Sequence, residues 1–494
     1  MIATMFMNAR VNECRKAMRH AEDFATWRDG ALAFDEANGF EDWKHEDESP
    51  EYDWQLIRER LAQIRQYRDT RQVVKLMRHL RQGLHWNLGN MANPALYSHT
   101  YFGTKRLIET YLAEVVDALR FIADGNFPGL TAADKLRFFN ETAASFGRSA
   151  LMLSGGATLG LFHVGVVKAL VREGLLPEVI SGSSAGSIVA SVIGTRAPDE
   201  LEELLDPDNS YYHFWKPLSA REMWQRGALM DQKQIALGIA RNTEDLTFEE
   251  SYERSGRVVN VTVSPAGSNQ PPRLLNYLTT PYLYLREAVL ASSAVPLLFP
   301  PVQLMTKDDD GSRVPYMPGL RWTDGSLKSD LPGIRLRRLH NVNHFIVSQT
   351  NPHVIPFVRG ANERTGVIGA LREVAYGAMR GGAQSVIGVG KFGVPLSGVR
   401  RQLDNASSIL DQDYRGNITI VPKVSVWRYA HVTANPKLEA VTRFILEGER
   451  ATWKRIAMVR NQSMISQTLA ACVKQLEIEA QRPPLRKLKV VAKR

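Results

Sequence analysis

Hydrophobic positions in the first third of the chain recur at helical spacing. In residues 54–64 (WQLIRERLAQI) and 71–84 (RQVVKLMRHLRQGL), apolar residues return every three or four positions, with arginines between them. The same period continues from Leu107 to Ile122. We therefore predict an α-helical region over residues 51–145. Its apolar stripes either pack on one another and on the next domain, or contact acyl chains or a membrane directly.

Short apolar runs replace this pattern in the middle of the chain. They are ALMLS at 150–154, EVIS at 178–181, VVNVTVS at 258–264 and HFIVSQT at 344–350. Such runs, separated by helical segments, are typical of strands buried in a parallel sheet, so residues 146–425 are predicted to form an α/β domain. Helical spacing returns within 426–494, which ends in a basic tail. Residues 1–50 form a variable, acidic segment whose last stretch suggests an exposed connection.

The composition is that of a large globular protein. The 494 residues are 44% hydrophobic and 23% charged, which is enough for a sizeable core and more than one domain. An excess of 62 Lys+Arg over 52 Asp+Glu gives a net charge of +10, which suits an anionic membrane surface, nucleic acid or solubility alone. Because the basic residues are dispersed and no recognised reader module is present, we do not expect nucleic-acid binding.

The two cysteines, Cys14 and Cys472, lie at opposite ends of the chain. They provide neither a metal-ligand spacing nor a disulfide framework, so we expect no metal, no cofactor and a reducing, cytoplasmic location. The first residues place apolar side chains before basic ones, the reverse of a signal peptide. The longest uncharged run, residues 288–306, contains three prolines and would make a poor membrane-spanning helix. Any membrane contact is expected to be peripheral.

A turn of small residues follows the first apolar run of the α/β domain. It reads LSGGATLG and contains Gly155, Gly156, Ala157 and Gly160. Its spacing matches neither the dinucleotide-binding pattern nor the P-loop. Exposed backbone amides at the start of a helix favour negative charge. We therefore predict that the N–H groups of Gly155, Gly156 and Ala157 hold an oxyanion.

A second turn, GSSAG at 182–186, has the spacing G-x-S-x-G, with Ser184 between Gly182 and Gly186. Ser184 lies 29 residues after Gly155, about the length of one strand–helix–strand unit. A right-handed crossover then places both turns at the carboxyl ends of neighbouring parallel strands. A serine on a sharp turn beside free amides is suited to acyl transfer, so we predict Ser184 as the nucleophile. The alternative is a tight turn without catalytic function.

Several residues could act as the base for this serine. Asp324 follows a strand-like run and precedes Gly325, although Asp-Gly is also a common turn dipeptide, and Asp330 is a nearby alternative. The histidines that follow Asp324 in the chain are His340, His344, His353 and His431. A Ser-Asp-His order therefore stays open. His163, in the helix after the glycine turn, is interpreted as a packing residue.

Together these motifs resemble the patatin-like phospholipase family. The likeness rests on SGGATLG, GSSAG, AVLASSAVPLLFPP and DGSLKSDLP, in that order between residues 148 and 335. The flanking stretches 84–112, 348–354 and 448–457 are similar to the subgroup of yeast lipid-droplet triacylglycerol lipases and the plant seed-oil lipase. The resemblance implies a three-layer α/β/α sandwich with a mainly parallel sheet, preceded by an α-helical N-terminal region and followed by C-terminal helices.

The resemblance also implies a Ser-Asp dyad without histidine. It assigns the nucleophile to Ser184 and the base to Asp324, and it leaves Asp330 a structural role. The family's loop usually reads G-G-G-x-[RK]-G, whereas Ala157 stands here for the third glycine and Leu159 for the basic residue. Backbone amides survive both changes. The missing cation favours neutral glycerides over phospholipids.

The implied activity is that of a serine acyl hydrolase, a lipase or phospholipase that cleaves fatty-acyl esters of glycerolipids through an acyl-serine. Triacylglycerol is the favoured substrate, and the expected partner is a membrane or lipid-droplet surface. Three alternatives stay open. The same dyad could serve a phospholipase A, a lysophospholipase or an acyltransferase; a histidine could be the base, as in α/β-hydrolases; or the chain could be a non-catalytic lipid-binding scaffold.

Overall fold

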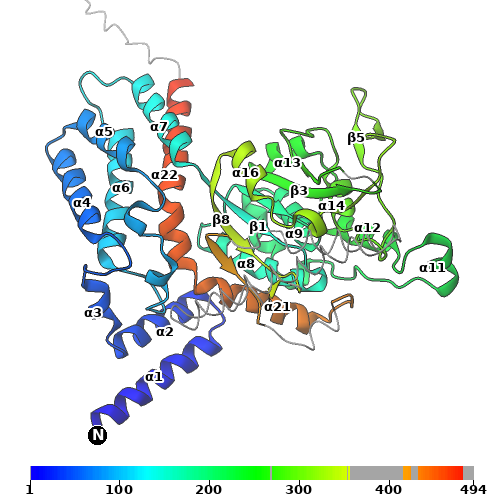
Figure 1. Ribbon diagram of the computed structural model, residues 1–494, viewed down its shortest axis with the longest axis horizontal. Coiled ribbons are helices and arrows are strands. Elements are labelled where there is room, and N and C mark those ends of the chain that lie inside the picture. The colour runs from blue at the N-terminus through cyan, green and yellow to red at the C-terminus, as the bar shows by residue number, and fades with distance from the viewer. Residues whose placement is uncertain (1, 268–269, 353, 356–415, 424–431, 482–494) are drawn as a thin grey trace, which may run out of the picture. The chain divides into compact units, whose positions relative to one another are not determined.

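The computed structural model describes residues 2–267, 270–352, 354–355, 416–423 and 432–481 (Figure 1). These residues form two compact units. The first lies within residues 1–13, 31–148 and 460–494, and the second within residues 14–30 and 149–459. His353, His431 and the basic tail lie outside the described residues.

The N-terminal part of the chain is helical, as its apolar spacing predicts. The helices are α1 (Ile2–His20), α2 (Phe24–Ala37), α3 (Phe40–His45), α4 (Trp54–Asp69), α5 (Val73–Gly83), α6 (Arg106–Asp124) and α7 (Ala132–Phe146), with the 3₁₀ turns η1 (Leu88–Asn90) and η2 (Pro94–Tyr97). Most of α22 (Ile456–Gln481) also belongs to the first unit. The sequence pattern indicates only a variable, acidic segment for residues 1–50, whereas α1 to α3 occupy most of that stretch.

The apolar stripes of the first unit pack on one another. Ile57 and Leu61 of α4 and Leu76 and Leu80 of α5 are buried, and both helices pack against α6. The apolar face of α6 is buried from Leu107 onward. Removing such side chains from water is the main favourable contribution to folding. In the described residues these stripes therefore form a core, the first of the two interpretations above.

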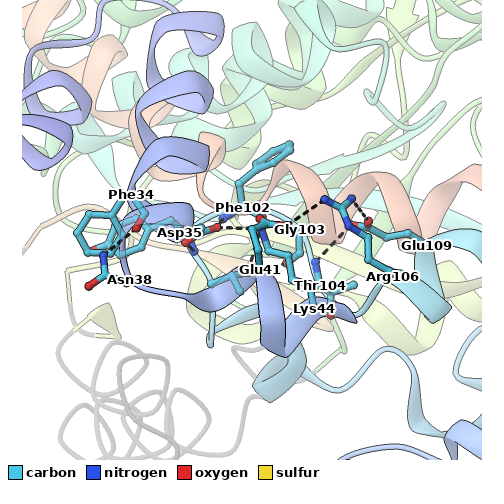
Figure 2. A network of polar contacts seen from close by, with 12 residues as sticks. Phe34, Asp35, Asn38, Glu41, Lys44, Phe102, Gly103, Thr104, Arg106 and Glu109 are labelled. Atoms are coloured by element: carbon cyan, nitrogen blue, oxygen red, sulfur yellow. Dashed lines mark hydrogen bonds and ion pairs between the residues drawn. The ribbon is translucent and has the colours of Figure 1, made fainter. Parts of the chain in front are cut away.

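A buried lysine structures part of the acidic stretch that the charge pattern suggests is exposed. Nζ of Lys44 in α3 lies 3.1 Å from Oδ2 of Asp35 and 2.6 Å from Oε1 of Glu41, as Figure 2 shows. Asp35 also accepts hydrogen bonds from the N–H groups of Tyr101 and Phe102, at 2.8 and 3.1 Å. An exposed connection is thus the wrong interpretation for α3, because its lysine is paired inside the unit.

In the part of the chain that the structure describes, the second unit is built on a seven-stranded sheet. Its strands are β1 (Arg148–Leu153), β2 (Val179–Gly182), β3 (Val258–Pro265), β4 (Arg273–Leu275), β7 (Trp322–Asp324), β8 (Val342–Ser348) and β9 (Ile418–Ile420), in the order β4-β3-β2-β1-β8-β9, with β7 paired to β3. β2 runs parallel to β1 and β3, and β8 runs parallel to β9, whereas β4 and β7 are antiparallel to β3. The short strands β5 (Met305–Lys307) and β6 (Arg313–Pro315) pair separately. The sheet is thus mixed but mainly parallel.

Helices cover both faces of this sheet. They are α8 (Leu161–Arg172), α9 (Ala185–Gly194), α10 (Leu201–Leu204), α11 (Ala220–Arg226), α12 (Gln232–Asn242), α13 (Phe248–Ser255), α14 (Leu285–Ser292), α15 (Ser326–Ser329), α16 (Gly333–His340) and α21 (Leu438–Trp453), with the 3₁₀ turns η3 (Ala157–Gly160), η4 (Pro198–Glu200) and η5 (Pro207–Asn209). Leu336 of α16 packs with Met152 and Val258 on one face. On the other face, Gly194 of α9 contacts Val259, the next residue of β3. Because side chains alternate along a strand, this is a three-layer α/β/α sandwich.

Among the described helices, none combines the length and the apolar content needed to cross a bilayer.

Candidate active site

The glycine turn and the serine turn leave the sheet side by side. β1 and β2 are paired and parallel, with Leu153 opposite Gly182. The adjacency predicted from the 29-residue spacing is therefore confirmed. The two turns approach closely: a Cβ atom at position 155 would lie 3.4 Å from Cβ of Ser184.

Ser184 lies on a strained turn between β2 and α9. Its backbone has φ 50° and ψ −122°, a conformation that residues other than glycine rarely adopt. Its N–H donates to Oγ of Ser292 at 3.0 Å, and that hydroxyl donates in turn to the carbonyl of Thr262 at 2.8 Å. Neither motif glycine leaves room for a side chain, because the backbone packs closely around both. A Cβ at Gly182 would lie 2.4 Å from the Gly186 carbonyl oxygen, and a Cβ at Gly186 would lie 2.2 Å from the Leu153 carbonyl oxygen. The strained serine, held by specific contacts, has the form of a nucleophile elbow.

Asp324 is buried at the end of β7. Its Oδ1 accepts the N–H of Ser326 at 2.7 Å, while Oδ2 accepts no hydrogen bond of ordinary geometry from any described residue. Burial raises the pKa of the Asp324 carboxyl to about 6, although hydrogen bonds from the Ser326 N–H and the Ser184 hydroxyl act in the opposite direction. Gly325 is needed next to it, because a Cβ there would lie 2.4 Å from the Thr262 carbonyl oxygen. The structure therefore brings Ser184 and Asp324 together.

Asp330 holds the glycine turn, and this corrects the prediction for Gly155. Oδ1 of Asp330 accepts the N–H of Gly155 at 2.8 Å, so that amide already has a partner. The carbonyl of Asp330 accepts the hydroxyl of Ser183 at 2.8 Å. Burial raises the pKa of the Asp330 carboxyl to about 7. Asp330 and Ser183 thus fix the two turns to each other, a function that the sequence does not reveal for Ser183.

Three other backbone amides face the cavity beside Ser184. Gly156 is the N-cap of η3, Ala157 begins η3, Ala185 begins α9, and all three residues line the cavity. The first N–H groups of a helix have no partner within it, and no acceptor for these three is found among the described residues. Gly156 leaves no room for a side chain, because a Cβ would lie 2.2 Å from Oγ1 of Thr350. Ala185 was not predicted, although the residue after the serine commonly donates in such an elbow.

The cavity that contains these groups is lined mainly by apolar side chains. Its volume is about 300 Å³, at the lower end of the range for small-molecule sites. Besides Ser184, Asp324 and the glycine turn, its walls include Leu161, Val164, Ile188, Val189, Val192, Leu205, Tyr211, Phe214, Trp215, Ile235, Val295 and Leu298. Among the described residues that line it, Asp324 alone carries an ionisable carboxylate, and Lys and Arg are absent. Such a site suits an uncharged acyl chain.

Comparison with known proteins connects this geometry to a family. A model described as patatin-like phospholipase matches residues 151–333, and one described as a domain of unknown function (DUF3336) matches residues 4–144. The chain is 32% identical to triacylglycerol lipase ptl3 of Schizosaccharomyces pombe, over 94% of this chain and 98% of that protein. This chain belongs to the patatin-like phospholipase family.

Two longer patatin-like relatives have similar identity. The chain is 34% identical to triacylglycerol lipase SDP1L of Arabidopsis thaliana, over 96% of this chain and 61% of that protein. It is 35% identical to triacylglycerol lipase 4 of Saccharomyces cerevisiae, over 90% of this chain and 51% of that protein. The chain thus spans between half and two thirds of the length of these two relatives.

The patatin-like loop of this chain departs from the usual pattern at a strained position. Ala157, which stands for the third glycine, has φ 50°. Glycine adopts positive φ without the steric cost that a Cβ imposes. Ala157 bears this steric cost here, and it still lines the cavity.

The described histidines do not line this cavity. His163 is fully buried, with Nδ1 2.7 Å from Oγ of Ser348 and Nε2 2.9 Å from the carbonyl oxygen of Ser154. Burial lowers its pKa to about 4, so the ring is neutral, and Nε2 carries the proton because a carbonyl only accepts. His163 packs beneath the glycine turn, consistent with its interpretation as a packing residue.

His340 and His344 also have partners elsewhere. Nε2 of His340 lies 2.9 Å from Oδ1 of Asn260, and Nδ1 of His344 lies 2.9 Å from Oγ of Ser149. Neither lines the cavity. The interpretation of a histidine as the base is therefore wrong for His340 and His344. In the described residues, no group of three or more His, Cys, Asp or Glu side chains is placed to hold a metal ion.

Proposed function

We propose that this chain is a serine acyl hydrolase that cleaves fatty-acyl esters of glycerolipids through a Ser184-Asp324 dyad. The observation that carries the proposal is the buried carboxyl of Asp324 beside the strained Ser184, at the polar end of an apolar cavity. A carboxylate whose pKa is raised by burial is a stronger base than an exposed one. Its unpartnered Oδ2 supplies a site for the proton of the serine.

In the first half of the reaction, the Ser184 hydroxyl attacks the ester carbonyl and its proton passes to Asp324. The amides of Gly156, Ala157 and Ala185 donate to the tetrahedral oxyanion. The intermediate collapses to an acyl-serine, and the leaving alcohol takes the proton from Asp324. In the second half, water attacks the acyl-serine, Asp324 accepts a proton from this water, and Ser184 regains one as the fatty acid leaves.

We favour triacylglycerol as the ester. Three relatives are named triacylglycerol lipases. The described lining of the cavity has no cation for a phosphate group, and Leu159 stands where the usual loop has a basic residue. Because such esters are insoluble in water, the enzyme is proposed to work peripherally at a membrane or lipid-droplet surface.

The test is covalent labelling by a fluorophosphonate probe, followed by turnover of a lipid panel of triacylglycerol, phospholipid and lysophospholipid with products identified by mass spectrometry. Ser184→Ala should lose labelling and at least about a thousandfold in turnover. Ser210→Ala is the matched control, because Ser210 lines the same cavity but lies on a different segment. Wild-type turnover in Ser184→Ala overturns the proposal, and loss of turnover in His353→Ala or His431→Ala would favour a histidine base.

A further inference from the structure

Helix α11 is capped at both ends, but none of its residues packs in a hydrophobic core. It forms the tip of a loop whose two arms meet where Pro217 and Met230 pair antiparallel. A capping box of Ser219 and Glu222 begins the helix, and Gly227 in the left-handed conformation ends it. None of the residues of α11 is buried, and Trp224 is 88% exposed. Figure 1 shows α11 projecting from the α/β unit, at the side away from α16.

A second exposed apolar residue adjoins the base of this loop. Leu297 is 75% exposed and has φ 74°, which is unfavourable for a bulky side chain. Its carbonyl accepts the N–H of Leu229 at 3.1 Å, and Leu229 is itself 45% exposed. The strained backbone of Leu297 brings its side chain no burial within the described chain. A surface of another molecule that covers this side chain would account for the strain.

Residues that line the cavity lie next to this apolar surface in the chain. Val295 and Leu298, on either side of Leu297, line the cavity. Phe214 and Trp215, just before the loop that carries α11, line it as well. Two segments thus run from the wall of the cavity to the exposed apolar residues.

The charges around α11 favour an anionic surface. Asp231 is paired with Lys216 and Arg226, each at 3.6 Å, and Glu222 lies 3.6 Å from the same Arg226. Arg221 and Lys233 make no ion pair with any described residue. Cations beside an exposed tryptophan and leucines are the combination that binds the interfacial region of anionic lipid layers.

We propose that a docking surface, made of Trp224, Leu229 and Leu297 with Arg221 and Lys233, inserts into the phospholipid layer that holds the ester. The layer then covers the exposed apolar side chains while its anionic headgroups meet the two cations. This inference rests on the proposed function, because it brings the cavity of the hydrolase to the lipid that contains its substrate.

The experiment uses the full chain and vesicles of phosphatidylcholine, with or without phosphatidylserine. In the double variant Trp224→Ser, Leu297→Asn, co-sedimentation with the vesicles should weaken at least about tenfold, because two large apolar side chains no longer leave water. Asparagine tolerates the positive φ of position 297, so the loop is kept. Arg221→Gln with Lys233→Gln should remove the preference for phosphatidylserine. The matched control is Ile334→Ser on α16, which is 70% exposed and outside the docking surface, and should bind as wild type.

Assays with two ester substrates distinguish a failure of the docking surface from a failure of the proposed function. The double variant should hydrolyse a soluble short-chain ester as fast as wild type, which shows that it is folded, and should lose hydrolysis of triacylglycerol in phospholipid-coated droplets. Unchanged vesicle binding by the double variant overturns the docking surface. If the self-association of the chain changes as well, the surface is an interface between copies of the chain. If wild type hydrolyses neither ester but the binding differences hold, the proposed function fails and the docking surface stands.

Discussion

The carboxylate of Asp330 accepts the backbone N–H of Gly155 at 2.8 Å, although 175 residues separate them in the chain. The same aspartate accepts the Ser183 hydroxyl through its carbonyl. One residue outside the proposed dyad thereby fixes the glycine turn relative to the serine elbow. These contacts give the buried Asp330 a structural role in the site.

We expect Asp330→Ala and Asp330→Asn to differ sharply. Alanine leaves the Gly155 N–H buried without an acceptor, so the turn should shift and kcat on a soluble ester should fall about 10- to 100-fold with KM little changed. Asparagine keeps an acceptor oxygen and should retain most activity. Steady-state kinetics on the two variants, with thermal melts to show that both are folded, make the comparison. Equal losses in both variants would mean that the negative charge of Asp330, not the hydrogen bond, is what matters.

Activity should fall as the pH is lowered through about 6. The base must be ionised, and burial raises the pKa of Asp324 to about 6 from its ordinary value of 3.8. The measurement is the pH profile of kcat/KM for a soluble ester, which reports the free enzyme. The acid limb should stay near the same pH in Asp330→Asn, because burial raises the pKa of Asp330 to about 7 and keeps it mainly neutral where Asp324 ionises. A limb close to pH 4 would contradict the burial of Asp324.

Asp324→Asn should abolish activity and stabilise the fold at pH 7. The folded-state pKa of Asp324 lies above the unfolded value, so the folded protein binds the proton more tightly and stability falls as the pH rises from about 3.8 to 6. An uncharged amide escapes this cost, and we expect a gain of about 1–2 kcal/mol in the free energy of unfolding at pH 7. Denaturant unfolding at pH 7 and pH 3.5 checks it, because the gain should vanish at the lower pH. A variant less stable than wild type at pH 7 would count against a desolvated carboxylate.

Neighbouring substitutions in the glycine turn should have opposite outcomes. A Cβ at Gly156 would lie 2.2 Å from Oγ1 and 2.9 Å from the carbonyl oxygen of Thr350, so Gly156→Ala must displace the turn and misplace its amide. We expect a loss of about 100-fold in kcat, as when an oxyanion donor is removed. Ala157→Gly keeps the amide and relieves a φ of 50°, so it should be as active as wild type and at least as stable. Full activity in Gly156→Ala would exclude its amide from the oxyanion site.

The spacing of the motifs along the chain predicts those parts of the site that lie on neighbouring strands. The distance from Gly155 to Ser184 is one crossover unit, and β1 and β2 are paired as it requires. Asp324 could not be found in this way, because an Asp-Gly pair is common in turns and its burial depends on strands that lie far apart in the chain. The partner of the Gly155 amide was missed for the same reason. Sequence shows that the turn is rich in amides, but not which of them are already occupied.

The N-terminal unit shows a different limit of sequence patterns. Lys44 lies in a run of charged residues that is usually solvated, and nothing local marks its side chain as buried. Its burial is possible because Asp35 and Glu41 lie within 3.1 Å and 2.6 Å of its ammonium group. The pattern likewise does not indicate the helix at residues 2–20. Which face of that helix is covered depends on its contacts with other helices, and the sequence does not show these contacts. Pairing between distant residues thus decides burial where composition suggests exposure.

Asp35 and Glu36 are adjacent acidic residues, and both form ion pairs, but they should differ in what they contribute to stability. Asp35 is buried with Lys44 and accepts two backbone N–H groups, as Figure 2 shows. Glu36 pairs with Arg10 where both side chains are more than half exposed. Asp35→Ala removes one of the two carboxylates paired with the buried Lys44 and leaves the two amides without their acceptor, so the free energy of unfolding of the first unit should fall by about 3–5 kcal/mol. Glu36→Ala should change it by less than about 1 kcal/mol. Denaturant unfolding at low and high salt tests the pair, because only the exposed ion pair is screened by salt. Similar losses for the two variants would mean that the Lys44 cluster is open to solvent.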